Sequence, residues 1–387
     1  MRRIRINMFD IGLSIFLFLS PIILLPAIGN IAALQFYQFG IISNNNAFLQ
    51  LQFFQFGIVG LFILSFFQKR IRELNDSWMG LFMAGCLVSV FLHPKSVSVI
   101  TNIFLGFLLY KLTFEYVKNV KLVLFPICVV SILNFIFEVL QLFGVYLVYN
   151  PTDRIDGLMA FSSHLGAYQA MVIPILYLFN PLLAIVPIIG FILAKSTPVY
   201  ISVFLCGGYL IIKKIKNLGS VWLMFCMSLI TLFIIKGGKR LLSEFFVRIW
   251  IQKETIKDLT YFGKGLGNFK KVCELPVNVN FHNAVYPNET FENPLSIYLG
   301  VIYALGILSI PVFIWIYGNI EQYKRVKKDN ILKALFLSSM ILIMIGFGQS
   351  CMDFPRLAGT IIIIFGLLKI KLLEAEYGAN QICRGAS

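Results

Sequence analysis

The chain has few charged residues for its length. Only 13% of its 387 residues are Asp, Glu, Lys or Arg, and the 33 basic residues outnumber the 18 acidic ones. Because a soluble domain carries roughly 25% charged residues, this shortage excludes an ordinary soluble fold. The excess of basic residues does not indicate nucleic-acid binding, since the topology of a membrane protein also produces such an excess.

Metal and redox motifs are also missing. The sequence has three His and seven Cys, with no CxxC motif and no Cys and His cluster at the spacing of metal ligands. No repeat of about 20–50 residues is visible, and the two halves do not resemble each other. We therefore expect neither a metal nor another cofactor, and no architecture built from repeats.

Hydrophobic residues dominate instead, at 58% of the chain, with 38 Phe. A bilayer core about 30 Å thick needs roughly 20 apolar residues per helix. The sequence thus predicts one all-α domain over residues 1–387, a polytopic membrane protein with about 12 transmembrane helices. The expected spans are 8–29, 50–67, 77–92, 97–114, 122–148, 158–179, 181–195, 197–212, 219–235, 294–318, 331–350 and 355–372.

The basic residues predict the orientation of these spans. With the amino terminus inside the cell, twenty Lys and Arg fall in the terminal segments and loops on the cytoplasmic side. Only four fall in the short loops on the other side. Since Lys and Arg concentrate in short cytoplasmic loops, both termini are expected in the cytoplasm, and the one large loop, residues 236–293, is expected outside it.

The large loop is predicted to contain an amphipathic helix at residues 240–259. Its apolar side would carry Leu242, Phe245, Phe246, Ile249 and Ile256. The run GKGLGNF at 263–269 superficially suggests a nucleotide-binding loop. No buried strand precedes it and it faces away from the cytosol, so a glycine-rich turn is the better interpretation.

Four of the cations expected on the outer side stand out: Arg154, Lys195, Arg248 and Arg356. Topology gives no reason for them. Arg binds phosphate through its planar fork, and Lys does so as a compact point charge. Each could be an ordinary loop charge, but two or more brought together would form a site for a pyrophosphate.

Other polar groups lie within or near the membrane. Asn134, Glu138 and Gln141 share one face of the fifth span, and His164 lies near the outer end of the sixth. Such groups either bond to neighbouring helices or line a cavity open to the outside. His282 and Glu292, just before the tenth span, are the candidates for a general base.

At this point the chain resembles the O-antigen polymerase and O-antigen ligase superfamily of bacterial envelope glycan proteins. Four segments carry the resemblance in order: DRIDGLMAFSSHLGAY, AKSTPVYISVFLCGGYL, RIWIQKETIKDLTYFGKGLGNF, and a His-Asn or Glu-Asn pair before a span ending in ALGIL. They cover about residues 153–308. The chain departs from the family at Thr197-Pro198, where members often carry Arg.

The resemblance implies a bundle similar to membrane glycosyltransferases of the GT-C type, in the bacterial inner membrane. It implies a metal-independent glycosyltransferase that polymerises oligosaccharide repeat units linked to undecaprenyl pyrophosphate. Arg154, Arg248, Lys195 and Arg356 would bind the pyrophosphate, and His282 or Glu292 would act as the base. Expected partners are the lipid-linked oligosaccharide, membrane lipid, and a chain-length regulator and flippase.

Two alternatives stay open. An O-antigen ligase would transfer the finished glycan to lipid A-core, and it shares the expected topology. A flippase or other transporter of lipid-linked oligosaccharide also suits twelve spans, although transporters of that size often have two related halves.

Overall fold

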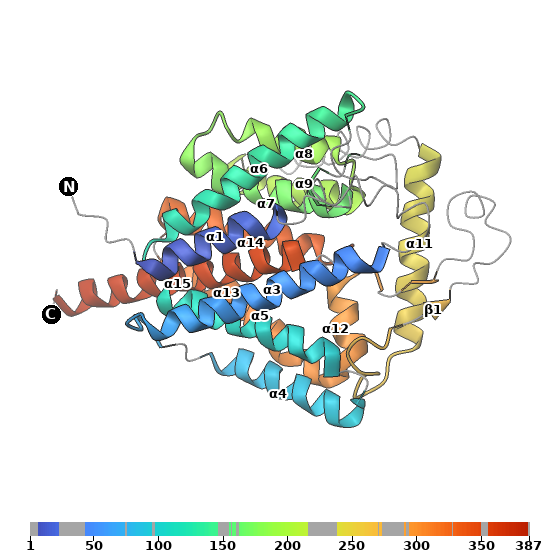
Figure 1. Ribbon diagram of the computed structural model, residues 1–387, viewed down its shortest axis with the longest axis horizontal. Coiled ribbons are helices and arrows are strands. Elements are labelled where there is room, and N and C mark those ends of the chain that lie inside the picture. The colour runs from blue at the N-terminus through green and yellow to red at the C-terminus, as the bar shows by residue number, and fades with distance from the viewer. Residues whose placement is uncertain are drawn as a thin grey trace.

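The fold is all-α. The computed structural model describes residues 7–22, 43–73, 76–94, 97–145, 155, 157–159, 162–215, 238–269, 271–272, 290–291, 294–326, 328–349 and 355–385. Apart from one pair of two-residue antiparallel strands, every regular element in these ranges is helical. Figure 1 shows long helices packed side by side, with α11 lying across one end of them.

The helices match the expected spans closely. Eleven of the twelve predicted spans coincide with helices, and the span at 219–235 lies outside the described residues. The elements are α1 Met8–Ile22, α3 Ser43–Phe66, α4 Ser77–Leu92, α5 Val97–Tyr116, α6 Val120–Leu142, α7 Ser162–Phe179, α8 Ile185–Leu193, α9 Thr197–Ile215, α11 Gly238–Lys257, β1 Lys271–Val272, β2 Thr290–Phe291, α12 Ile297–Leu305, the 3-10 helix η2 Gly306–Ser309, α13 Ile310–Arg325, α14 Asn330–Ile345 and α15 Pro355–Gly385.

Short polar side chains fix several helix starts. Asp76, Asn119 and Asp329 accept hydrogen bonds from backbone N–H groups in the first turns of α4, α6 and α14. Such caps satisfy donors that have no partner within the helix. This local chemistry explains why these three helices begin within two residues of the predicted positions.

Two helical segments of the described chain are long and apolar enough to cross a membrane: Val120–Leu142 and Ile297–Arg325. The second is broken at Gly306, where φ is +56°. In Figure 1, α12 runs beside α11 across the end of the bundle, whereas α13 runs back along it. At about 1.5 Å per residue the nine-residue α8 is roughly 14 Å long, which is too short to cross a bilayer core alone.

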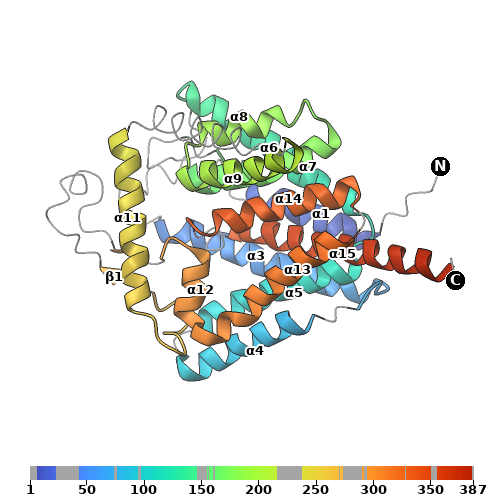
Figure 2. The same ribbon diagram turned by 180° about the vertical axis from the view of Figure 1, so that it is seen from behind.

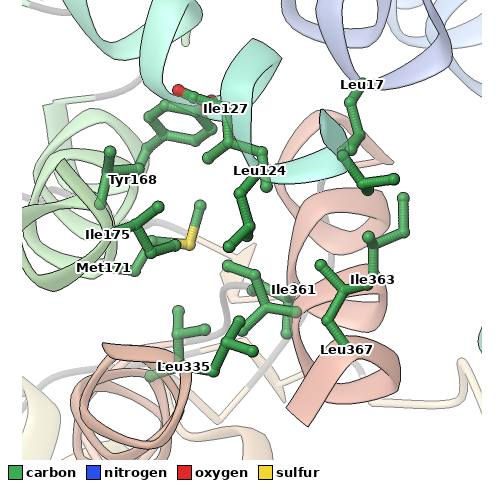
Figure 3. Close-up of a cluster of buried hydrophobic side chains, with 14 of the residues drawn as sticks. Leu17, Leu124, Ile127, Tyr168, Met171, Ile175, Leu335, Ile361, Ile363 and Leu367 are labelled. Carbon is green, nitrogen blue, oxygen red and sulfur yellow. The ribbon is translucent and has the colours of Figure 1, made fainter. Parts of the chain in front are cut away.

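The main core lies where α6, α7, α14 and α15 meet. Leu124, Met171, Leu335, Ile361 and Leu367 converge there with almost no exposed surface, as Figure 3 shows. A hydrogen bond also joins α14 to α7 across this core: the Ser338 hydroxyl donates to the Met171 carbonyl oxygen at 2.6 Å. The core holds α15 at the centre of the bundle.

The outside of the bundle is also apolar. Phe91 is 86% exposed and Leu182 is 75% exposed, and Phe56, Phe66 and Phe125 are exposed as well. A soluble monomer rarely exposes so many large apolar side chains, whereas lipid tails solvate them well. Burial inside the molecule therefore accounts for only part of the hydrophobic excess in the sequence.

The two ends of the bundle differ. At the end where α1 begins and α15 finishes, ion pairs join Arg70 to Glu115 at 2.5 Å and Arg72 to Glu374 at 2.6 Å. Lys371 pairs with Asp329 at the same end. Figure 2 shows this end and α11 at opposite sides of the molecule. The four segments that carry Arg70, Glu115, Asp329 and Lys371, all predicted to be cytoplasmic, are thus gathered together, away from α11.

Candidate functional site

Two of the four predicted outer cations, Lys195 and Arg248, have described side chains. Arg356 lies in the first turn of α15, but its side chain is outside the described residues. Arg154 and both base candidates, His282 and Glu292, also lie outside them. The geometry therefore bears on Lys195 and Arg248 and on the residues that surround them.

Lys195 lies in the sharp turn between α8 and α9. It adopts φ +50°, a left-handed conformation uncommon for residues other than glycine, and its side chain is exposed. The next residue, Ser196, is buried, and Thr197 begins α9. The turn therefore places a positive charge directly before the amino end of a 19-residue helix, where backbone dipoles also attract anions.

A close approach of α7 holds this turn in place. A Cβ atom on Gly166 would lie 3.2 Å from the Ser196 Cβ and 3.4 Å from the Ala194 Cβ. Glycine thus allows α7 to pack directly against the turn. His164, two residues earlier on α7, is buried at this same end of the bundle.

Arg248 comes from α11 and contacts the end of α14. Its Nη1 donates to the carbonyl oxygen of Gly348, and one helical turn later Gln252 Nε2 donates to that of Phe347 at 3.2 Å. The Ser296 hydroxyl, at the start of α12, donates to the Gly346 carbonyl oxygen at 3.2 Å. Side chains from α11 and α12 thus satisfy carbonyl groups that the end of a helix leaves without partners.

The end of α14 also contacts the start of α9. A Cβ atom on Gly348 would lie 3.1 Å from the Cβ of Pro198. Gly348 therefore contacts the Arg248 guanidinium on one side and the turn that carries Lys195 on the other. We call the region formed by residues 195–198, residues 347–349 and Arg248 the outer polar site.

Two buried polar side chains of the outer polar site were missed by the sequence analysis. Gln349 is 5% exposed and Ser196 is 4% exposed, and neither the Gln349 amide nor the Ser196 hydroxyl has a hydrogen-bond partner among the described residues. The sequence gives little indication that Gln349 is buried. Gln349 stands at the end of an apolar run, in GFGQS, and a polar residue at the end of a span is usually an exposed loop residue.

Asn134, Glu138 and Gln141 form a separate buried network. The Asn134 and Gln141 side-chain oxygens each accept at 3.0 Å from backbone N–H groups, those of Leu158 and Gly157 respectively. Gln169 Nε2 of α7 donates to Glu138 Oε1 at 2.7 Å. These bonds join α6 to its neighbours, as the packing alternative expects.

The loop after α11 forms the expected glycine-rich turn. Gly263, Gly265 and Gly267 all have positive φ, and a Cβ on Gly265 would lie 2.6 Å from that of His93. Positive φ and close contact with His93 thus explain why glycine stands at position 265. Nearby, Lys264 pairs with Asp258, and this hydrogen bond raises the pKa of the Lys264 ammonium.

The side of α11 that packs against the bundle is not the apolar side predicted from the sequence. Val247, Ile251 and Thr255 are buried toward α12, whereas Ile249 and Ile256 are exposed. The reason is that Tyr303 of α12 and Phe269 of the following turn pack against the first set. The other residues expected on that side, Leu242, Phe245 and Phe246, have side chains outside the described residues.

Comparison with known protein families, with curated proteins and with solved structures finds no match to this chain. The resemblance to the O-antigen polymerase and ligase superfamily stays a prediction from the sequence. Among the described residues no group of three His, Cys, Asp or Glu could hold a metal ion. The groups available for chemistry in the outer polar site are thus cations, amides and hydroxyls.

Proposed function

We propose that the protein is a twelve-span enzyme of the bacterial inner membrane that polymerises oligosaccharide repeats linked to undecaprenyl pyrophosphate. Both termini would lie in the cytoplasm and the outer polar site on the opposite face. The observation that carries this proposal is that Gly348 accepts a hydrogen bond from Arg248 and also lies against Pro198, three residues after Lys195. The cations come from segments about fifty residues apart in sequence.

The proposed topology is supported by the shape and chemistry of the bundle. The start of α1 and the end of α15 lie at the basic end, as an even number of crossings requires. Exposed Phe and Leu side chains on the flanks suit contact with lipid tails. The Lys and Arg residues gathered at the basic end match the bias of cytoplasmic loops.

In the proposed reaction, the bond between the glycan's first sugar carbon and the pyrophosphate oxygen breaks. A bond from that carbon to a hydroxyl oxygen of the next lipid-linked repeat forms. The hydroxyl proton passes to His282 or Glu292, and Lys195, Arg248, Arg154 and Arg356 stabilise the negative charge on the departing pyrophosphate. Positioned cations make a metal unnecessary for this step.

Lys195 gives the cleanest test because its side chain is exposed. We expect Lys195→Gln to reduce polymer formation roughly tenfold or more, since a charge-assisted contact to the departing group is lost. Lys195→Arg should retain most of it. The measurement is the glycan chain-length ladder on gels from a source strain lacking the gene and complemented with each variant.

The matched control is Lys121→Gln, which removes an exposed Lys at the basic end of the bundle. It should leave the ladder and the thermal stability unchanged. An unaltered ladder in Lys195→Gln, with Arg248→Ala also unaltered, would overturn the assignment of the outer polar site.

The deletion strain itself distinguishes the alternatives. Loss of a polymerase leaves single repeats attached to lipid A-core, and loss of a ligase leaves long glycan on the lipid carrier. Loss of a flippase leaves single lipid-linked repeats on the cytoplasmic face. The first result supports the proposal, and either of the other two contradicts it.

A further inference from the structure

The amide of Gln349 is a buried polar group without a partner. It stands next to Gly348, whose carbonyl oxygen accepts from Arg248, and only 5% of its surface is exposed. Neither the amide oxygen nor the amide nitrogen has a hydrogen-bond partner in the described part of the chain. Leaving such a group unbonded is costly, so the fold alone gives no reason for Gln at this position.

A second unpartnered group lies close by. The buried Ser196 hydroxyl belongs to the turn that reaches the end of α14 through Pro198, since a Cβ on Gly348 would lie 3.1 Å from the Pro198 Cβ. Two neutral, buried and unpartnered polar side chains thus lie next in sequence to residues of the outer polar site: Gln349 follows Gly348, the partner of Arg248, and Ser196 follows Lys195. Gln349 lies outside the motifs that the sequence suggested, and Ser196 lies within the segment AKSTPVYISVFLCGGYL but had no assigned role.

The chemistry of an amide restricts what can bind to it. Gln carries both a donor and an acceptor, and a phosphate group at neutral pH offers essentially only acceptors. A phosphate would therefore leave the Gln349 oxygen unbonded, whichever way the amide is turned. A sugar hydroxyl or acetamido group both donates and accepts, and so it satisfies both amide atoms.

We propose that Gln349, together with Ser196, binds a hydroxyl or acetamido group of the sugar nearest the pyrophosphate. This inference rests on the function proposed above. It assigns the charged and the neutral side chains of the outer polar site to different parts of the substrate. The cations Lys195 and Arg248 bind the pyrophosphate, and the neutral pair recognises the sugar. Gln349 is then a determinant of sugar specificity.

The test is Gln349→Met, which keeps the size of the side chain and removes its polar atoms. The full-length protein, reconstituted in nanodiscs, is titrated with two probes by microscale thermophoresis. One probe is the lipid-linked oligosaccharide extracted from the source strain deleted for this gene, and the other is undecaprenyl pyrophosphate. We expect the variant to bind the oligosaccharide about tenfold more weakly, the equivalent of one hydrogen bond, and to bind undecaprenyl pyrophosphate unchanged.

Thermal stability without ligand separates recognition from a structural role. Removing an unbonded buried amide should leave the melting temperature of ligand-free Gln349→Met unchanged or higher. Gln55→Met is the matched control, because Gln55 Nε2 donates to Asn102 Oδ1 at 2.9 Å. That variant should melt at a lower temperature and bind both probes normally.

Three outcomes overturn the inference. If Gln349→Met melts earlier and keeps its affinity, the amide has a structural partner such as a buried water. If the wild type binds both probes and Gln349→Met binds both equally well, the sugar is recognised elsewhere while the proposed function stands. If the wild type binds neither probe, the proposed function fails, and the role of Gln349 fails with it.

Discussion

Glu138 shows how a single polar residue can stabilise the packing of a membrane bundle. Its side chain has no exposed surface and accepts from Gln169 at 2.7 Å, while Gln169 Oε1 accepts from the Ser131 hydroxyl at 2.5 Å. A Cβ on Gly190 would lie 2.7 Å from Glu138 Oε2, so α8 packs directly on this carboxyl group. The network thus joins α6, α7 and α8.

We predict that Glu138→Gln keeps the melting temperature near that of the wild type, because the new side-chain oxygen still accepts from Gln169. Glu138→Ala should destabilise the protein by about 2–3 kcal/mol, through a lost hydrogen bond and a cavity. Thermal unfolding of detergent-solubilised protein measures both. Equal loss in the two variants would show that the carboxyl group itself, rather than its shape and bonds, is required.

The sequence could single out a candidate site residue only where its charge is unusual for its predicted side of the membrane. Lys195 and Arg248 stood out as cations on the expected outer side, and the structure places Arg248 against Gly348 and Pro198, three residues after Lys195, against the same glycine. Gln349 could not be found this way, since a Gln at the end of a span is ordinary. Its burial depends on α9 and α14 coming together, which is a tertiary property.

At the scale of elements, two glycines hold the α11 end of the bundle together. Gly263 and Gly306 have φ +74° and +56°, and each lies against the backbone of the segment that contains the other. The Ile307 N–H donates to the Tyr261 carbonyl oxygen at 2.9 Å, and the Lys264 N–H donates to that of Tyr303 at 2.8 Å. A side chain at either glycine would push the loop after α11 away from α12.

Gly263→Ala should therefore lower stability by about 2–4 kcal/mol, from both positive φ and a backbone collision. Gly80→Ala in α4 is the control, because a Cβ there meets nothing within 4 Å. It should be neutral or slightly stabilising. Melting temperatures and limited proteolysis of the loop after α11 report the difference, and similar values for the two variants would contradict this packing.

The positions of helices were largely predictable, whereas their lengths and directions were not. Hydrophobic runs placed eleven spans on helices that form, although α15 extends to Gly385 where the predicted span ends at 372. The break at Gly306 was missed, because residues 294–318 read as one apolar run. Backbone hydrogen bonds to the segment 261–265, about 45 residues earlier, account for the turn.

For the whole molecule, the account depends on which side of the membrane each end of the bundle faces. The basic end gathers Arg70, Arg72 and Lys371, and the other end carries α11 and the outer polar site. The lipid-linked donor and the acceptor meet outside the cytoplasm in the proposed reaction. A site facing the cytosol could not perform it.

The most direct measurement is cysteine labelling in intact cells, in a background where the seven native cysteines are replaced. Lys253→Cys reports on the exposed side of α11, and Lys121→Cys reports on the basic end. We predict that a membrane-impermeant maleimide added outside, after the outer membrane is permeabilised, labels Lys253→Cys and leaves Lys121→Cys unlabelled until the inner membrane is opened. Labelling of Lys121→Cys with protection of Lys253→Cys would contradict the proposed topology and the reaction assigned to it.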